Sequence, residues 1–267
     1  MYTGYNLVLT KEKAELLINE YKTNNSTNQY YGSEEEGILG KSPAYREISR
    51  QMKDNIAACV PSGDALPEWD APSESPIVKA DIFLAHSEKD GELARALADW
   101  MSRNFNVRVF LGTWFDKHSR RMQDEIKNRA GSENLPLDKI QDIEDVAVIG
   151  NLMKIIDTTE CFIFLNTENA MADMDPVVSQ SDYSGRLYFE ILVTSLIRRS
   201  LSDRQKLQQK RLAKVKLADR PKIKSIPACS HLLPMTGKTL DAWYIKYGQA
   251  GIVSPMDLLY EVAEETR

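Results

Sequence analysis

The sequence of 267 residues has few of the features that mark secreted, membrane-spanning or zinc-binding proteins. Its three cysteines are scattered and form no C-x-x-C pair, and their odd number argues against a disulfide framework. The three histidines are not spaced with cysteines as zinc ligands are, so no metal site is predicted. No apolar run approaches the ~20 residues of a membrane helix, and the first ten residues do not resemble a secretion signal. We therefore expect a cytoplasmic protein without a membrane partner.

Two further classes of protein are excluded by what the sequence lacks. The net charge of -5 gives no bulk attraction to nucleic acid, so a nucleic-acid partner is not expected. There is no G-x-G-x-x-G loop for a dinucleotide. Residues 236–239 read T-G-K-T, like the end of a phosphate-binding P-loop, but Leu232 stands where that motif needs glycine. An ATPase is therefore rejected.

Composition divides the chain near residue 76. Residues 1–76 are predicted to be a helical N-terminal extension, with an apolar helix face between Lys11 and Tyr21, followed by a proline-rich linker. Residues 77–267 are predicted to form one domain with a basic helical insertion at 198–224. That insertion holds eleven Lys or Arg and two Asp, a net charge of +9 that leaves -14 for the rest. It is interpreted either as a solvated helix that complements the acidic body or as a contact for an acidic partner, a nucleic acid or an anionic ligand.

A strand, a helix and a second strand follow one another at the start of the second part. Residues 80–85 form a short apolar run typical of a buried strand. Ser87 and Asp90 have the spacing of a capping box, which predicts a helix that ends near Asn106. Residues 107–111 are then a second strand. A crossover this short predicts that the two strands are parallel.

The alternation of strands and helices continues more loosely to the end of the chain. The predicted elements are a helix at 146–156, the strongest buried strand at 161–165, a long polar loop at 166–185, a helix at 187–197, a strand at 230–235 and a helix at 257–263. This order predicts an α/β fold with a doubly wound, mainly parallel five-stranded sheet covered by helices on both faces.

Four segments of the second part, in the same order, resemble motifs of bacterial Toll/interleukin-1 receptor-like (TIR) domains. The family motifs are an opening strand and loop of the form D-x-F-[IL]-S-H-S-x-x-D, a second strand that leads into the BB loop, a fourth strand with its lead-in, and a segment S-P-W-I-x-x-E. The matching segments are residues 81–90 (DIFLAHSEKD), 107–111 (VRVFL), 155–167 (IIDTTECFIFLNT) and 183–191 (YSGRLYFEI). The resemblance implies a flavodoxin-like TIR fold and does not cover residues 1–75.

The resemblance also implies an activity. Bacterial and plant TIR enzymes cleave NAD+ between nicotinamide and ribose, some by hydrolysis and some by cyclising the ADP-ribose, and in bacteria this often serves antiphage defence. NAD+ would be the substrate, and no cofactor is implied. Nicotinamide leaves as a neutral base and needs no proton, so one carboxylate can suffice, by holding ribose hydroxyls and stabilising the growing positive charge. The family glutamate matches Glu190.

Glu190 also has a structural interpretation, as a favourable acidic residue in the first turn of a helix. As a catalytic residue, its carboxylate is expected to face a dinucleotide-sized cleft at the edge of the sheet. Tyr183 and Arg186 flank it as candidate NAD+-binding residues. Arg186 stands where the family usually has tryptophan, which changes the nicotinamide pocket. Its side chain is expected to pair with a phosphate of the dinucleotide or with an acidic neighbour.

Four other residues are candidates to bind NAD+, each with a structural alternative. His86 contacts the ribose or a phosphate, or is a polar loop residue. Ser87 is expected to cap the helix whose N-terminal N–H groups would face a phosphate. Trp114 stacks on a base of NAD+ or packs its loop onto the body, and Asp116 lies in the same loop.

Two other functions stay open from the sequence. One is a non-catalytic TIR module that assembles with other TIR domains through residues 112–117 and the long polar loop; the missing tryptophan supports it. The other is an enzyme like the nucleoside deoxyribosyltransferases, which share the sheet architecture and a catalytic glutamate. An active TIR enzyme is expected to be a homo-oligomer, in which one subunit's BB loop completes its neighbour's site.

Overall fold

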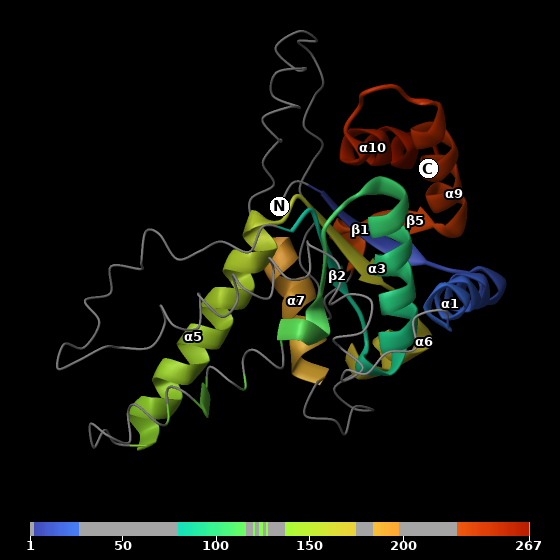
Figure 1. Cartoon of the computed structure of the whole chain (residues 1–267). Coiled ribbons are helices and arrows are strands. Elements are labelled where there is room, and N and C mark those ends of the chain that lie inside the picture. The colour runs from blue at the N-terminus through green and yellow to red at the C-terminus, as the bar shows by residue number, and fades with distance from the viewer. Residues whose placement is uncertain are drawn as a thin grey trace, which may run out of the picture.

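The computed structural model describes residues 3–26, 80–115, 120, 123–124, 127, 137–174, 184–197 and 229–266. The predicted linker and the basic insertion at 198–224 lie outside these residues. Five strands form a single all-parallel sheet in the order β3-β2-β4-β1-β5 (Figure 1). The strands are β1 (Thr3–Val8), β2 (Ile82–Ala85), β3 (Val109–Leu111), β4 (Cys161–Leu165) and β5 (Leu233–Thr236).

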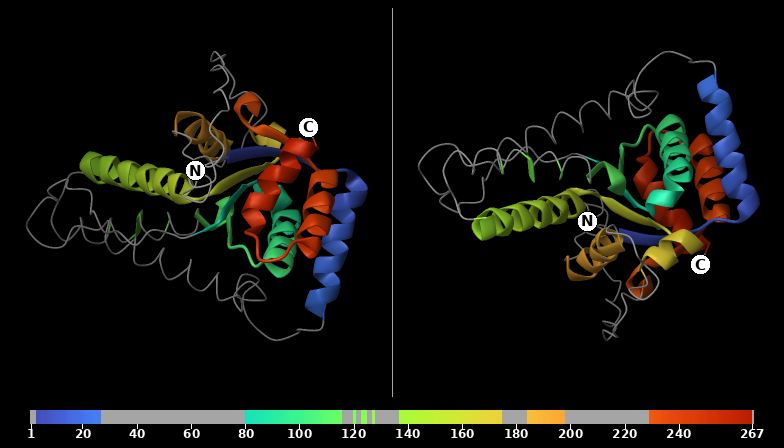
Figure 2. Two further views of the ribbon diagram at one scale, coloured as in Figure 1. Left: turned by 90° about the horizontal axis from the view of Figure 1, so that it is seen from above. Right: turned by 90° about the horizontal axis from the view of Figure 1, so that it is seen from below.

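Helices cover both faces of the sheet, as Figure 2 shows. On one face lie α1 (Lys11–Ser26), α3 (Gly91–Phe105), α9 (Gly237–Gln249) and α10 (Pro255–Glu265). On the other face lie α5 (Leu137–Thr158), α6 (Glu168–Met174) and α7 (Ser184–Leu196). The prediction of a doubly wound α/β fold is therefore confirmed. Within the described part of the chain, no helix combines the length and the apolar character needed to cross a membrane.

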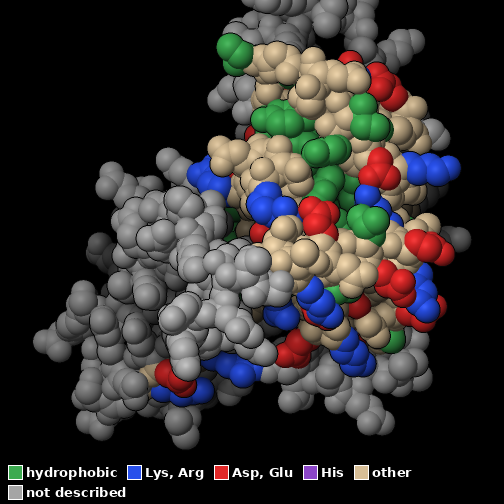
Figure 3. Space-filling view, turned by 45° about the vertical axis from the view of Figure 1, so that its right-hand side comes forward, with side chains coloured by type: hydrophobic (Ala, Val, Ile, Leu, Met, Phe, Trp, Pro, Cys, Tyr) green, Lys and Arg blue, Asp and Glu red, His purple; other side chains and the backbone are tan. Residues whose placement is uncertain are grey.

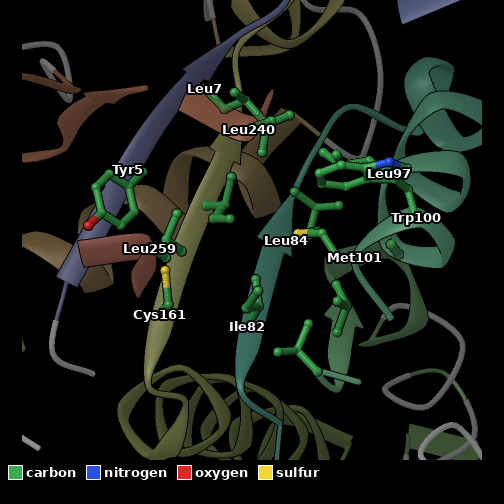
Figure 4. Close-up of a cluster of buried hydrophobic side chains, with 14 of the residues drawn as sticks. Tyr5, Leu7, Ile82, Leu84, Leu97, Trp100, Met101, Cys161, Leu240 and Leu259 are labelled. Carbon is green, nitrogen blue, oxygen red and sulfur yellow. The ribbon is translucent and has the colours of Figure 1, made fainter. Parts of the chain in front are cut away.

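Alternating strand residues build two separate cores. Ile82 and Leu84 of β2 point into the core beneath α3, α9 and α10 (Figure 4). Phe83, between them, points to the other face, where its ring stacks on Phe110 and Phe162 at centroid distances of 5.3 and 5.5 Å. Both faces of the strands are buried, which explains why the sequence shows continuous apolar runs rather than an alternation with polar residues.

Strand β1 overturns the predicted boundary near residue 76. It lies inside the sheet, with Thr3–Leu7 parallel to Cys161–Leu165 on one side and Tyr5–Val8 parallel to Leu233–Thr236 on the other. Residues 3–26 therefore belong to the same domain as the later strands. They are not an extension appended to it.

The composition of β1 explains why the sequence did not reveal it. Only Tyr5 and Leu7 are apolar residues that reach the core, with 1% and 0% exposure, and glycine or asparagine stands beside them. Gly4 packs closely against Leu232, because a Cβ at position 4 would lie 2.6 Å from Cδ2 of Leu232 and would force that side chain to shift. A strand with only two buried apolar side chains gives almost no hydrophobic periodicity in the sequence.

Helix α1 was predicted between Lys11 and Tyr21, and the structure confirms it. It lies against α3, where Lys22 pairs with Glu92 at 3.0 Å and Arg103 pairs with Glu20 at 3.4 Å. The side of the molecule that carries α1 shows acidic and basic side chains next to one another (Figure 3). Such exposed pairs contribute ~0–1 kcal/mol each, so buried apolar contacts dominate the docking of α1.

The later elements agree with the sequence only in part. Helix α9 (Gly237–Gln249) was not predicted, and α5 begins at Leu137 rather than near residue 146. The second βαβ strand, β4 and the closing helix α10 all occur where they were predicted. Helix α3 ends at Phe105 and is capped by Asn106, whose backbone adopts a left-handed conformation with φ of 53°. The predicted long polar loop instead begins with the two-turn helix α6, which buries Ala170 and Met174.

Candidate functional site

The connections of the sheet diverge between β2 and β4. From β2 the chain passes through α3 to β3 on one side, and from β4 it passes through α7 to β5 on the other. In open α/β sheets, ligands bind beyond the carboxyl ends of the strands at such a switch point. His86 and Ser87 follow β2 directly, and Asn166 and Thr167 follow β4. The topology therefore places the polar residues after these two strands where a ligand is expected.

Glu190 reaches this edge of the sheet from helix α7. Its carboxylate lies against the backbone of Gly112, the residue that follows β3: a Cβ on Gly112 would lie 2.7 Å from Oε1 of Glu190 and 2.6 Å from Nη1 of Arg186. A larger residue at position 112 would force one of these two side chains to shift. The side chain of Glu190 has no exposed surface, so it is not open to a cleft as expected.

Arg186 forms a buried ion pair with Glu190. Its Nη1 donates to Oε1 of Glu190 at 2.6 Å, and its Nη2 donates to the backbone carbonyl of His86 at 3.2 Å. The two side chains are four residues apart and share one face of α7. The sequence analysis expected Arg186 to pair with a phosphate or with an acidic neighbour. In the structure its partner is the acidic neighbour Glu190.

His86 is completely buried, and both of its ring nitrogens are engaged within the protein. Nδ1 donates to the carbonyl of Leu84 at 3.2 Å, and Nε2 accepts from the hydroxyl of Thr113 at 3.3 Å, which requires a neutral ring protonated on Nδ1. Burial, followed by the positive charge of Arg186 and then that of Arg95, lowers the pKa of His86 to about 3, against the opposing effect of the Leu84 carbonyl. His86 therefore acts as a neutral bridge between the residues after β2 and those after β3.

The depressed pKa of His86 makes stability depend on pH. Between its ordinary value of 6.5 and about 3, the unfolded chain binds a proton that the folded protein does not. The free energy of unfolding is therefore at its full value above pH 6.5 and falls as the pH falls through this window, by up to ~1.4 kcal/mol per pH unit. We expect His86→Asn, which keeps a donor for the Leu84 carbonyl, to lack this contribution. Urea unfolding at pH values from 4 to 8 measures it, and equal slopes for both proteins would contradict the prediction.

A second polar cluster joins the start of α3 to α6. Ser87 Oγ donates to Oδ2 of Asp173 at 2.6 Å and accepts from the backbone N–H of Lys89 at 3.2 Å. Ser87 therefore caps the short 3-10 helix Glu88–Asp90, as expected of a cap, but not α3 itself. The predicted capping box is wrong, because the carboxylate of Asp90 is turned away from Ser87 toward the residues after β4.

Asp90 holds the two strand ends together at the switch point. Its carboxylate accepts from the hydroxyl of Thr167 and, at 2.7 Å, from the side-chain amide of Asn169. The sequence pattern predicted a capping role for Asp90 and did not reveal Asn169 and Asp173, which lie inside the predicted loop. The position of Thr167 and Asn169 just after the strongest predicted strand was the available signal. Asp173 gave none, because its position depends on helix α6.

Of the three remaining candidates for NAD+ binding, only Trp114 is among the described residues. Trp114 is half-buried, packs between both cores, and meets Phe110 edge-on at a centroid distance of 5.8 Å. This contact matches the packing alternative considered for Trp114. Asp116 and Tyr183 lie outside the described residues. Among the side chains that are described, no three or more His, Cys, Asp or Glu gather as metal ligands.

Comparisons with family models, with curated proteins and with solved structures gave no match to this chain. A doubly wound sheet by itself does not define an activity, because this architecture carries many unrelated functions. The function therefore has to be argued from the side chains at the carboxyl edge of the sheet.

Proposed function

We propose that this chain is a TIR-domain NAD+ nucleosidase that cleaves the nicotinamide–ribose bond, with Glu190 as its catalytic residue. The observation that carries the proposal is the position of the Glu190 carboxylate, beside Gly112 at the carboxyl edge of the sheet and in hydrogen-bond contact with Arg186. Catalytic and binding residues of doubly wound proteins gather at this edge. The four motif resemblances, which include Glu190 itself, support the same activity.

The proposed reaction requires only one carboxylate. The C1′–N bond breaks, and its electron pair goes to the nicotinamide nitrogen, which becomes neutral. Glu190 holds the ribose hydroxyls and stabilises the positive charge that grows at C1′. In hydrolysis, a water oxygen bonds to C1′ and its proton passes to solvent, which yields ADP-ribose. In the cyclising alternative, a nitrogen of the adenine takes the place of water.

Side chains of both signs lie at this edge of the sheet. Arg186 and Arg95 act on the buried ring of His86, and Glu190, Asp90 and Asp173 are acidic. The net charge therefore does not select an anionic substrate, and the group proposed to meet a phosphate of the dinucleotide is the guanidinium of Arg186. Binding by Ser87, Trp114, Asp116 and Tyr183 is part of the proposal.

The burial of Glu190 implies that the active state differs from an isolated single chain at rest. We propose that the protein acts as a homo-oligomer in the cytoplasm, in which residues 112–117 of a neighbouring subunit complete the site. A role in antiphage defence is part of the proposal, because the TIR resemblance implies it.

The test is release of nicotinamide from NAD+ by concentrated or crowded protein. Glu190→Gln removes the charge and preserves the shape of the side chain, and we expect the rate to fall by about 10²–10³-fold, the usual loss for one electrostatic contact to the transition state. Glu264→Gln, on the exposed side of α10, is the matched control and should keep the full rate. Release that survives Glu190→Gln would remove Glu190 from its catalytic role.

One observation favours a second candidate, the non-catalytic TIR interaction module. Glu190 has no exposed surface and is ion-paired, as a residue with a purely structural role would be. This candidate predicts no release of nicotinamide under any condition that assembles the protein. Exchange of a nucleoside's base for a free base in the same assay would instead indicate the deoxyribosyltransferase-like activity.

A further inference from the structure

Arg186 is the more accessible member of its ion pair with Glu190. The Arg186 side chain keeps 10% of its surface exposed, whereas the Glu190 side chain keeps 0%. The guanidinium is also tied to the backbone of the site, through its bond to the carbonyl of His86. A ligand that approaches from solvent can therefore contact the Arg186 side chain, whereas the Glu190 side chain offers it no surface.

Contact between Glu190 and a ribose requires this ion pair to open. Oε1 of Glu190 already accepts from Arg186 at 2.6 Å, and Gly112 closes the space on another side of the carboxylate. A buried guanidinium that loses its carboxylate needs another anion, because an unpaired buried charge is strongly unfavourable. The substrate must therefore supply that anion if the pair is to open.

A phosphate is the anion best suited to replace the carboxylate. The planar fork of a guanidinium donates two parallel hydrogen bonds to a carboxylate or to a phosphate with similar geometry. We infer that Arg186 selects phosphate-bearing substrates: a substrate phosphate takes the guanidinium from Glu190, and the freed carboxylate then becomes available to the ribose. This inference rests on the proposed function, and it gives a role to the residue that replaces the tryptophan usual in TIR enzymes.

The exchange makes a prediction about substrates. NAD+ carries two phosphates, whereas nicotinamide riboside has the same scissile bond and none. A substrate without phosphate cannot release Glu190 from Arg186, so the wild-type protein should discriminate strongly against it. Arg186 acts here through Glu190, as a positioning and specificity-determining residue.

Binding of ADP-ribose tests the exchange without relying on activity. Calorimetry should show that Glu190→Gln binds ADP-ribose about tenfold more tightly than the wild-type protein, because Arg186 is no longer held by a charged partner, and that Arg186→Gln binds it at least about tenfold more weakly. Arg186→Lys, which keeps the cation, should recover part of the affinity. Arg103→Gln, which removes an arginine paired with Asp99 on α3, is the control and should bind like the wild-type protein.

Kinetics with both substrates separates this inference from the proposed function. We expect wild-type protein to prefer NAD+ over nicotinamide riboside by about 10²-fold in kcat/KM, and Arg186→Gln to reduce that preference to less than about tenfold. Release that depends on Glu190, but with an unchanged preference in Arg186→Gln, overturns the inference and leaves the function standing. No release from either substrate, with the expected order of ADP-ribose affinities, overturns the function and leaves the exchange standing. If Arg186→Gln does not fold, equal ADP-ribose affinity of Glu190→Gln and wild-type protein still overturns the exchange.

Discussion

A fragment of residues 77–267 will not form a cooperatively folded domain. It lacks β1, which is hydrogen-bonded to β4 over Thr3–Leu7 and to β5 over Tyr5–Val8. Without it, β4 and β5 have no common neighbour, and the buried side chains of Tyr5 and Leu7 are missing from the core. Each buried side chain of this size stabilises the fold by ~1.5–3 kcal/mol, and the strand also supplies hydrogen bonds on both of its edges. Total stabilities are only ~5–15 kcal/mol, so the loss is enough to unfold the protein.

Near-UV circular dichroism and thermal unfolding of the fragment and of the whole chain provide the measurement. Two adjacent positions of β1 supply matched point variants in the whole chain. Leu7→Ala, with 0% exposure, should lower the free energy of unfolding by ~2–5 kcal/mol, whereas Val8→Ala, with 49% exposure, should lower it by less than ~1 kcal/mol. A sharp, two-state melt of the 77–267 fragment would show that β1 is dispensable.

The ion pair between Arg186 and Glu190 predicts the second large effect. Arg186→Met leaves the carboxylate of Glu190, which has no exposed surface, without its cation, and should lower the free energy of unfolding by ~3–5 kcal/mol. Glu190→Met should cost less, because the Arg186 side chain keeps 10% of its surface exposed and retains its bond to the His86 carbonyl. The double variant should be more stable than Arg186→Met alone, because a well-packed apolar pair avoids the desolvation of two charges.

A double-mutant cycle with urea unfolding measures the coupling between the two side chains. The exposed pair of Lys246 and Glu265, at 2.9 Å between α9 and α10, is the control, and its coupling should be below ~1 kcal/mol because solvent screens it. If the two methionine substitutions were simply additive, Arg186 and Glu190 would not depend on one another. The exchange of partners inferred for Arg186 would then lose its physical basis.

Physical causes explain why some strands and helices were predicted from the sequence and why β1 was not. Buried strands of a parallel sheet carry apolar side chains on both faces. The strand Cys161–Leu165 could therefore be predicted from five consecutive apolar residues. The helix α3 was identified because its apolar residues recur along one face. The strand β1 carries glycine and asparagine on the face that meets the core beneath α5, α6 and α7. It therefore shows no continuous apolar run and was not predicted.

Some features of the candidate site could likewise be predicted from local sequence, and others depend on tertiary contacts. The sequence by itself determined the doubly wound class and the placement of His86 and Ser87 after a buried strand, because these depend on local pattern. The proposal of Glu190 as the catalytic residue likewise comes from the sequence, through its motif. Only the tertiary structure decided that residues 3–26 belong to the domain, that Asp90 turns to Thr167 and Asn169, and that Arg186 pairs with Glu190 beside Gly112. These features join segments that are far apart in the chain or depend on which way a buried side chain turns, and no local pattern of residues records such contacts.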